Sequence, residues 1–171
     1  MLKKNIVLIG FAGCGKTTVG VVLSRLLNVP FYDSDTEIVK STGESIPDIF
    51  SSQGESTFRE IEKEIILKLS DSAEPCVIST GGGCVKSPEN ISNLKENGVV
   101  VHLMSTPEKI YSNIKDDESR PLLKADDKLA EISKLMGERA PLYEEYADIT
   151  VDVSGIDAEA AAKMICASIF A

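Results

Sequence analysis

A glycine-rich run at positions 10–17, with the sequence GFAGCGKT, holds residues whose types and spacing suggest chemistry. It matches in full the pattern GxxxxGK followed by Ser or Thr. Glycines let backbone N–H groups curl around phosphate oxygens, because no Cβ stands in the way. In this pattern the lysine reaches the β- and γ-phosphates of a nucleotide, and the hydroxyl takes one position around Mg²⁺. The run therefore predicts an ATP site made by Gly13, Cys14, Gly15, Lys16, Thr17 and Thr18.

Two carboxylates follow at Asp33 and Asp35. Side chains two residues apart on an extended chain point to the same side, so both would face one cleft. One could hold a Mg²⁺ water while the other orients and deprotonates an attacking hydroxyl. The alternative is an acidic turn that caps the next helix.

A second set of residues suits an anionic acceptor. Arg59 and Glu62 lie three residues apart and therefore share a helix face. They form either a surface ion pair worth at most about 1 kcal/mol, or a carboxylate-binding fork held in place by Glu62. The spacing alone does not decide. Three consecutive glycines, Gly81, Gly82 and Gly83, suggest close approach of a ligand to the main chain, although a tight turn is the simpler interpretation.

Two more arginines are candidates. Residues 115–127 are polar and charged around the sequence RPLL, which suggests a lid that closes over the nucleotide. Arg120 could then act as an arginine finger supplied by the same chain. Arg139 is a second candidate clamp for an anion. Either one could equally be an ordinary surface arginine.

Composition narrows the classes of function. A chain of 171 residues with a formal net charge of −9 argues against nucleic-acid and membrane-surface partners. The four cysteines show no CxxC spacing and no clustered histidine, so a zinc site is not expected. The N-terminal apolar run at residues 6–9 is too short for a signal peptide, and we expect a cytoplasmic protein. His102 lies in an apolar strand and is expected to be structural.

Strands alternate with helices along the chain. Apolar runs predict strands at residues 6–9, 29–32, 76–79, 99–103 and 148–153. Helical spacing is seen after the glycine-rich run, after Phe58 and over residues 158–169, whereas the stretch before Phe58 looks polar and turn-rich. Capping side chains before prolines predict two further helix starts, at Ser87 and Thr106. The alternation predicts a parallel sheet with helices on both faces and ligands at the carboxyl ends of the strands.

Six ordered signals, GFAGCGKT, DSD, FREIE, GGG, RPLL and RAPLY, together resemble those of shikimate kinases, a family of small-molecule P-loop kinases. The resemblance spans residues 6 to about 153. It implies a three-layer α/β P-loop kinase fold with a five-stranded parallel sheet of order 2-3-1-4-5. It also implies one domain over residues 1–171, with a substrate-binding segment at about 34–61 and a lid at about 113–126. A monomer is expected.

The activity implied by the resemblance is transfer of the γ-phosphate of ATP to the 3-hydroxyl of shikimate, on the route to chorismate and the aromatic amino acids. The implied roles follow the matched motifs. Thr17 and Asp33 hold one Mg²⁺, Lys16 and Arg120 act on the transferring phosphate, and Asp35 contacts the ring hydroxyls as the base. Substrate binding falls to Asp35, Arg59, Gly81, Gly82, Gly83 and Arg139.

Departures from the family pattern and three alternative functions remain at this stage. The family often has an arginine that stacks on adenine seven residues before the lid arginine, where this chain has Asn113. The rival functions are a gluconate kinase, a nucleoside-monophosphate kinase and a non-catalytic nucleotide-binding module. A separate hypothesis is that the positive loop activates Cys14, which lies near Cys84 in space, and makes the protein sensitive to oxidation.

Overall fold

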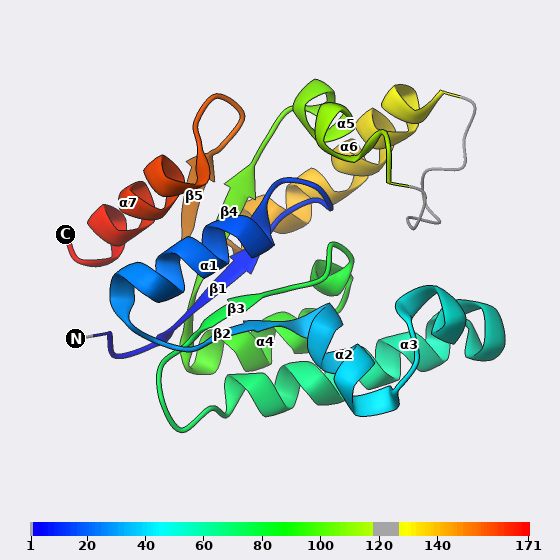
Figure 1. The fold of residues 1–171 in the computed structure, drawn as a ribbon, viewed down its shortest axis with the longest axis horizontal. Coiled ribbons are helices and arrows are strands. Elements are labelled where there is room, and N and C mark those ends of the chain that lie inside the picture. The colour runs from blue at the N-terminus through cyan, green and yellow to red at the C-terminus, as the bar shows by residue number, and fades with distance from the viewer. Residues whose placement is uncertain (1, 118–126) are drawn as a thin grey trace.

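The structure is a computed structural model that describes residues 2–117 and 127–171. In this part of the chain, five strands form one parallel sheet in the order β2-β3-β1-β4-β5 (Figure 1). The predicted α/β architecture and strand order are confirmed. The strands are β1 (Asn5–Ile9), β2 (Phe31–Asp33), β3 (Val77–Ser79), β4 (Gly98–Met104) and β5 (Ile149–Asp152).

Helices cover both faces of the sheet. The residues described form α1 (Lys16–Leu27), α2 (Ser34–Thr42), α3 (Ile46–Ser70), α4 (Pro88–Glu96), α5 (Pro107–Ile114), α6 (Lys128–Tyr146), α7 (Ala158–Ile169) and the short 3₁₀ helix η1 (Cys84–Lys86). The predicted starts of α4 and α5 are confirmed, since Ser87 and Thr106 accept hydrogen bonds from the first turns of these helices. None of the described helices is both long enough and apolar enough to cross a membrane.

Side chains of β1 alternate between two hydrophobic cores, one on each face of the sheet. Ile6 and Leu8 belong to the core that α1 and α7 cover, while Val7 and Ile9 belong to the core with α3 and α4. Every residue of β1 is buried. This two-sided burial explains the continuous apolar run at residues 6–9, because these side chains have no solvent-facing position. The one polar residue of the strand, Asn5, is buried, and its side chain accepts a hydrogen bond from the backbone N–H of Cys76.

The segment between β2 and the motif FREIE differs from the prediction. It is helical rather than turn-rich, and FREIE lies inside α3 instead of opening a helix. Helix α3 is broken at Gly54, whose φ of 84° and ψ of 169° are not helical. The apolar pattern is sparse because Ile38 and Ile49 are the fully buried anchors here, and the cap at Ser45 with Pro47 behind it starts α3.

Candidate active site

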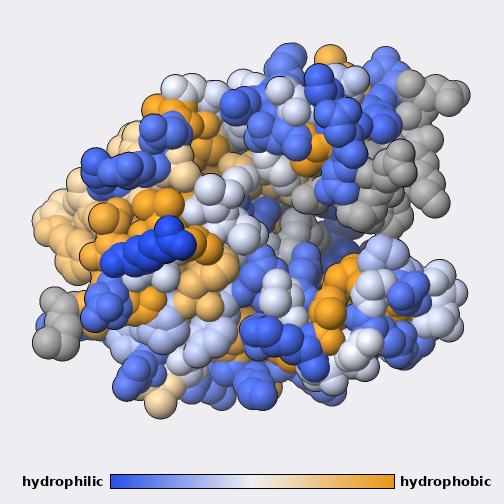
Figure 2. Space-filling view, viewed as in Figure 1, coloured by the Kyte–Doolittle hydropathy of each residue, from blue (hydrophilic) through white to orange (hydrophobic). Residues whose placement is uncertain are grey.

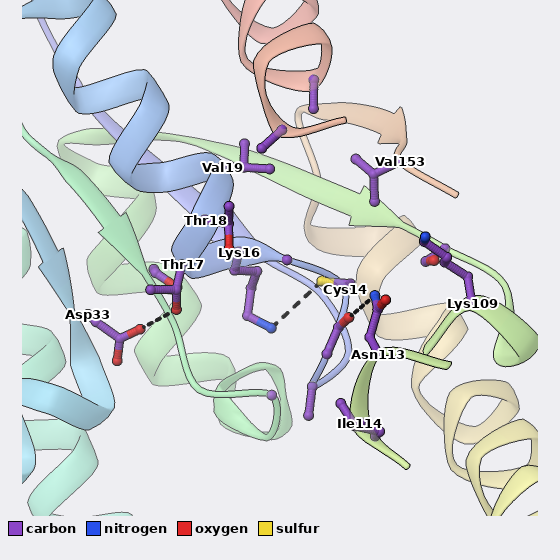
Figure 3. Close-up of a pocket in the computed structure, with 18 of the residues that line it drawn as sticks. Cys14, Lys16, Thr17, Thr18, Val19, Asp33, Lys109, Asn113, Ile114 and Val153 are labelled. Carbon is purple, nitrogen blue, oxygen red and sulfur yellow. Dashed lines mark hydrogen bonds between the residues drawn. The ribbon is translucent and has the colours of Figure 1, made fainter. Parts of the chain in front are cut away.

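The glycine-rich loop wraps around the ammonium group of Lys16. Lys16 Nζ donates to the carbonyl oxygen of Gly10 at 2.7 Å and to that of Phe11 at 3.2 Å. It also lies 3.8 Å from Cys14 Sγ (Figure 3). The side chain is buried, with 7% of its surface exposed. The loop therefore presents a buried cation at the N-terminus of α1, where the helix dipole also favours an anion.

The loop conformation needs glycine. Gly13 and Gly15 have φ angles of 86° and 95°, in the left-handed region. At Gly13 a Cβ would also collide with the side chain of Ile114. The neighbouring Asn113 donates from Nδ2 to the carbonyl oxygen of Gly13 at 2.9 Å (Figure 3). The end of α5 thus holds the phosphate-binding loop by one packing contact and one hydrogen bond.

Thr17 and Asp33 meet directly. The Thr17 hydroxyl donates to Asp33 Oδ2 at 2.8 Å, while Asp33 Oδ1 accepts from the backbone N–H groups of Asp35 and Thr36 (Figure 3). Both interpretations of Asp33 are therefore compatible, because one oxygen caps α2 and the other faces Thr17. A hydroxyl beside a carboxylate fits Mg²⁺, which takes few protein oxygens and keeps waters and substrate phosphates as its other ligands.

Asp35 lines the same cavity as Asp33, but its backbone conformation differs from the extended one that was expected. It lies in the first turn of α2, so the argument from an extended backbone is wrong. The helix instead turns the chain at Asp33, and both carboxylates still line the cavity beside the loop. Asp35 Oδ1 lies 2.9 Å from the point that a Cβ on Gly81 would occupy.

Arg59 is held by two carboxylates. Its Nη1 donates to Glu62 Oε1 at 2.9 Å, and its Nη2 donates to Glu55 Oε1 at 3.4 Å. Glu62 is 1% exposed and its Oε2 accepts no hydrogen bond from the residues described. Burial raises the pKa of Glu62, an effect that Arg59 opposes. Burial by itself lowers the pKa of Arg59. The nearby charges of Glu62 and Glu55 and their hydrogen bonds outweigh this effect, so the pKa of Arg59 is raised. This is not the solvated surface pair of the simpler interpretation.

Arg139 projects from α6 into the same region. The residue is 4% exposed. Its guanidinium donates from Nη1 to the carbonyl oxygen of Gly82 at 3.1 Å and lies over the ring of Phe11, 5.2 Å from the ring centroid. Arginines are rarely buried to this extent unless they are paired, because desolvation of the charge is costly. No pattern in the sequence predicts α6, so only the motif RAPLY pointed to Arg139.

Each glycine of the triplet packs against a different neighbour. A Cβ on Gly81 would approach Asp35 and Glu62, one on Gly82 would lie 3.1 Å from the backbone nitrogen of Ala12, and one on Gly83 would lie 2.5 Å from Arg59 Nη2. None of the three has a positive φ. The glycines are therefore needed for close approach rather than for an unusual turn, and the approaching groups are side chains and backbone of the site itself.

Two adjoining cavities lie beside these residues. The first, here called the loop cavity, has a volume of about 550 Å³ and is lined by the glycine-rich loop, which includes Thr17, and by Asp33. The second, the arginine cavity, has a volume of about 540 Å³ and contains Arg59 and Arg139. In the space-filling view the molecule is hollowed between the part with α5 and the part with α2 and α3 (Figure 2). Both cavities are lined by Ala12, Asp35, Gly81, Gly82 and Ile114.

Comparison with known proteins identifies the family. The shikimate kinase family model matches residues 12–169. The chain belongs to the shikimate kinase family. It is 46% identical to the shikimate kinase of Caldicellulosiruptor saccharolyticus over 162 residues, which cover 95% of this chain and 93% of that one. Among solved structures, shikimate kinase from Acinetobacter baumannii in complex with shikimate is 37% identical with a TM-score of 0.93, covering 98% of this chain and 93% of that chain. Shikimate kinase from Aquifex aeolicus is 42% identical with a TM-score of 0.84, covering 97% and 96%.

Two positions of the family pattern need comment in this chain. Arg120 and most of the expected lid, about residues 113–126, lie outside the described residues, and the role of Arg120 stays a prediction. Asn113 replaces an arginine of the family pattern, and its amide bonds the loop backbone at Gly13 instead. The loop cavity is also lined by Lys109, Val153, Ile156 and Ala158, among others.

The histidine and cysteine predictions differ in outcome. The ring of His102 stacks on Tyr143 with 4.6 Å between centroids, and burial together with the charge of Lys16 lowers the pKa of His102 to about 4. A neutral, packed imidazole agrees with the structural role that was predicted. Cys14 and Cys84 are buried, and burial raises the pKa of Cys84, which disfavours a reactive thiolate there. The oxidation hypothesis for Cys14 stays a prediction.

Several residues of the arginine cavity were missed from the sequence. The apolar wall is formed by Phe11, Ile46, Pro47, Phe50 and Phe58, and two further charged residues, Glu55 and Lys86, also line it. Phe11 carried a signal, since it follows the first glycine of the loop. Phe58 opens the motif FREIE. Ile46, Pro47, Phe50 and Glu55 lie in the first part of α3, whose helical character was not predicted, and Lys86 ends the 3₁₀ helix η1.

Proposed function

We propose that this chain transfers the γ-phosphate of ATP to the 3-hydroxyl of shikimate, giving ADP and shikimate 3-phosphate on the route to the aromatic amino acids. One observation carries the proposal beyond family membership. The loop cavity and the arginine cavity adjoin, and Asp35 lines both of them. A nucleotide in one and a small carboxylate-bearing polyol in the other would meet at this carboxylate.

The roles proposed on the nucleotide side follow from charge. Lys16, with the backbone N–H groups of Gly13 to Thr18, would neutralise the β- and γ-phosphates. Thr17 and Asp33 would hold one Mg²⁺, Asp33 through a water, because their oxygens already lie 2.8 Å apart. The bound ion would draw charge from the transferring phosphate. Arg120 is proposed to act on the same phosphate.

On the acceptor side, Arg59 and Arg139 would bind the carboxylate of shikimate. Two arginines give orientation as well as affinity, because each guanidinium offers parallel N–H groups to a carboxylate. Gly81, Gly82 and Gly83 form the wall between these side chains and the loop. The carboxylate would thereby fix which ring hydroxyl faces the nucleotide.

In the reaction proposed, the oxygen of the 3-hydroxyl forms a bond to the γ-phosphorus, and Asp35 accepts the proton that this hydroxyl loses. The bond from that phosphorus to the β–γ bridging oxygen breaks, and ADP leaves with the electron pair. Positioning and charge neutralisation supply most of the catalysis in such transfers. We also propose that the chain acts as a single domain and a monomer in the cytoplasm.

The test is ATP consumption with shikimate, quinate, gluconate and AMP in parallel. Turnover with shikimate should far exceed the ATPase background and the other three acceptors. The Lys16→Ala variant, purified identically, controls for contaminating ATPase activity and should show no turnover. A preparation that consumes ATP no faster with shikimate than without it would contradict the proposal, whereas turnover with gluconate or AMP alone would favour another kinase.

A further inference from the structure

Glu55 lines the arginine cavity but has no role in the scheme above. It is the first residue after the break in α3 at Gly54. Its side chain is 59% exposed, and its Oε1 lies 3.4 Å from Arg59 Nη2. The carboxylate of Glu55 therefore already pairs with one terminal nitrogen of the guanidinium that is proposed to bind the carboxylate of shikimate.

The geometry of Arg59 limits where an incoming carboxylate can bind. The guanidinium packs on Gly83, since a Cβ there would lie 3.0 Å from its central carbon, and that carbon lies over the Phe58 ring at 5.2 Å. Ligands must then bind in the guanidinium plane, where the N–H groups point. Any two-point contact in that plane uses at least one terminal nitrogen, and Glu62 and Glu55 each hold one.

The two acidic partners differ in how easily they can leave. Glu62 is 1% exposed and 2.9 Å from Nη1, so separating this pair would strand a buried charge. Glu55 is mostly in water and makes a longer contact, which is the kind of ion pair that contributes little. An arriving carboxylate can therefore displace Glu55 far more readily than Glu62.

We propose that Glu55 is an internal competitor for Arg59, holding Nη2 in the empty protein and yielding it to the carboxylate of the acceptor. The inference rests on the proposed function, because it takes Arg59 as the carboxylate site. Glu55 weakens acceptor binding through displacement and like-charge repulsion, and it is a specificity-determining residue. It opposes every anion at Arg59, so only an anion that makes further contacts in the cavity binds well.

The test compares the wild-type chain with Glu55→Gln, which keeps the side-chain shape and removes the charge. The KM for shikimate should fall by about 1.5- to 5-fold, the change expected for loss of an exposed ion pair, while kcat stays the same. Glu64→Gln is the matched control, since Glu64 is exposed on the same helix and does not line the arginine cavity; its KM should match that of the wild type. For the methyl ester of shikimate, which has no carboxylate, kcat/KM should be equal in wild type and Glu55→Gln.

The outcomes separate the possible explanations. An unchanged or raised KM in Glu55→Gln would overturn the inference and make Glu55 a support for Arg59. Equal decreases in Glu55→Gln and Glu64→Gln would show a general effect of net charge, and an equal gain with the methyl ester would show a change of cavity shape. Each of these two results would also overturn the inference about Glu55. Absence of turnover with shikimate in the wild type would be a different failure, that of the proposed function itself.

Discussion

Replacing Gly83 by Ala should weaken shikimate binding without unfolding the protein. A Cβ at this position would lie 2.5 Å from Arg59 Nη2 and 2.9 Å from Nη1, whereas ordinary contacts begin at 3.4 Å. The guanidinium must therefore move by about 0.9 Å. The backbone accepts alanine, since Gly83 has φ −95° and ψ 0°. The atoms in the way are the far end of a long side chain, so we expect little loss of stability.

The magnitude follows from the interaction that is lost. A displacement of this size moves the guanidinium of Arg59 away from the proposed site of the substrate carboxylate. A hydrogen bond to a charged group is worth about 1.5–3 kcal/mol, which corresponds to an increase of about 10- to 150-fold in the KM for shikimate. The KM for ATP should change little, because Gly83 does not line the loop cavity.

The assay is steady-state kinetics together with denaturant unfolding. Gly137→Ala is the matched control, since Gly137 lies in α6 and a Cβ there meets nothing within 4 Å. In an Arg59→Ala background the Gly83→Ala change should have no further effect, because the two act through one side chain. A normal KM in Gly83→Ala, or a full additional loss in the double variant, would refute the role given to this contact.

Three further predictions concern other charged or titrating groups. Arg139→Met should leave the free energy of unfolding unchanged or raise it, since a buried cation is replaced by an apolar chain, but it should weaken shikimate binding; lost stability with normal binding would contradict this. Asp33→Asn should keep the cap of α2 and raise the Mg²⁺ concentration needed for activity, while Asp33→Ala should also lower the unfolding free energy by about 0.5–2 kcal/mol; identical Mg²⁺ dependence in wild type and Asp33→Asn would argue against the metal role. The pKa of His102, lowered to about 4 by burial and Lys16, means that only the unfolded chain binds this proton between about pH 6.5 and 4. Stability should therefore fall as the pH falls through this window in urea titrations, and His102→Gln should flatten that dependence.

The parts of the fold that could be predicted from the sequence are those with strong local signals. Residues 6–9 of β1 are buried on both faces and read as an unbroken apolar run, and Ser87 and Thr106 cap helices in the way that their prolines indicated. The prediction failed for residues 34–57, because this segment has helix caps at Asp33 and Ser45 but few buried apolar residues. Two isoleucines, Ile38 and Ile49, anchor that segment, too few to establish a helical period.

For the candidate site, too, the part with strong local signals was the part that could be predicted from the sequence. The phosphate-binding loop is encoded in consecutive residues, so its sequence was sufficient to predict its chemistry. The arginine cavity is assembled from the glycine-rich loop, α2, α3, the glycine triplet, α5 and α6, and its lining residues run from Phe11 to Arg139. Spacing showed that Arg59 and Glu62 share a face, but not that Glu62 is buried or that Glu55 holds the second terminal nitrogen. Those facts depend on how α3 packs against the glycine triplet.

Buried charge distinguishes this site from the rest of the described surface. Among the described residues, the Lys, Arg, Asp and Glu side chains that are buried are Lys16, Glu62 and Arg139, and all three line one of the two cavities. Burying a charge is costly unless it is paired, and apolar replacements often stabilise a fold. Two of the three are cations in a chain with a net charge of −9. Their positions make sense when two anions bind here, because a few desolvated cations attract phosphate and carboxylate more strongly than many exposed ones would. The acidic surface then costs the site little, since salt screens exposed charges more than a Debye length away.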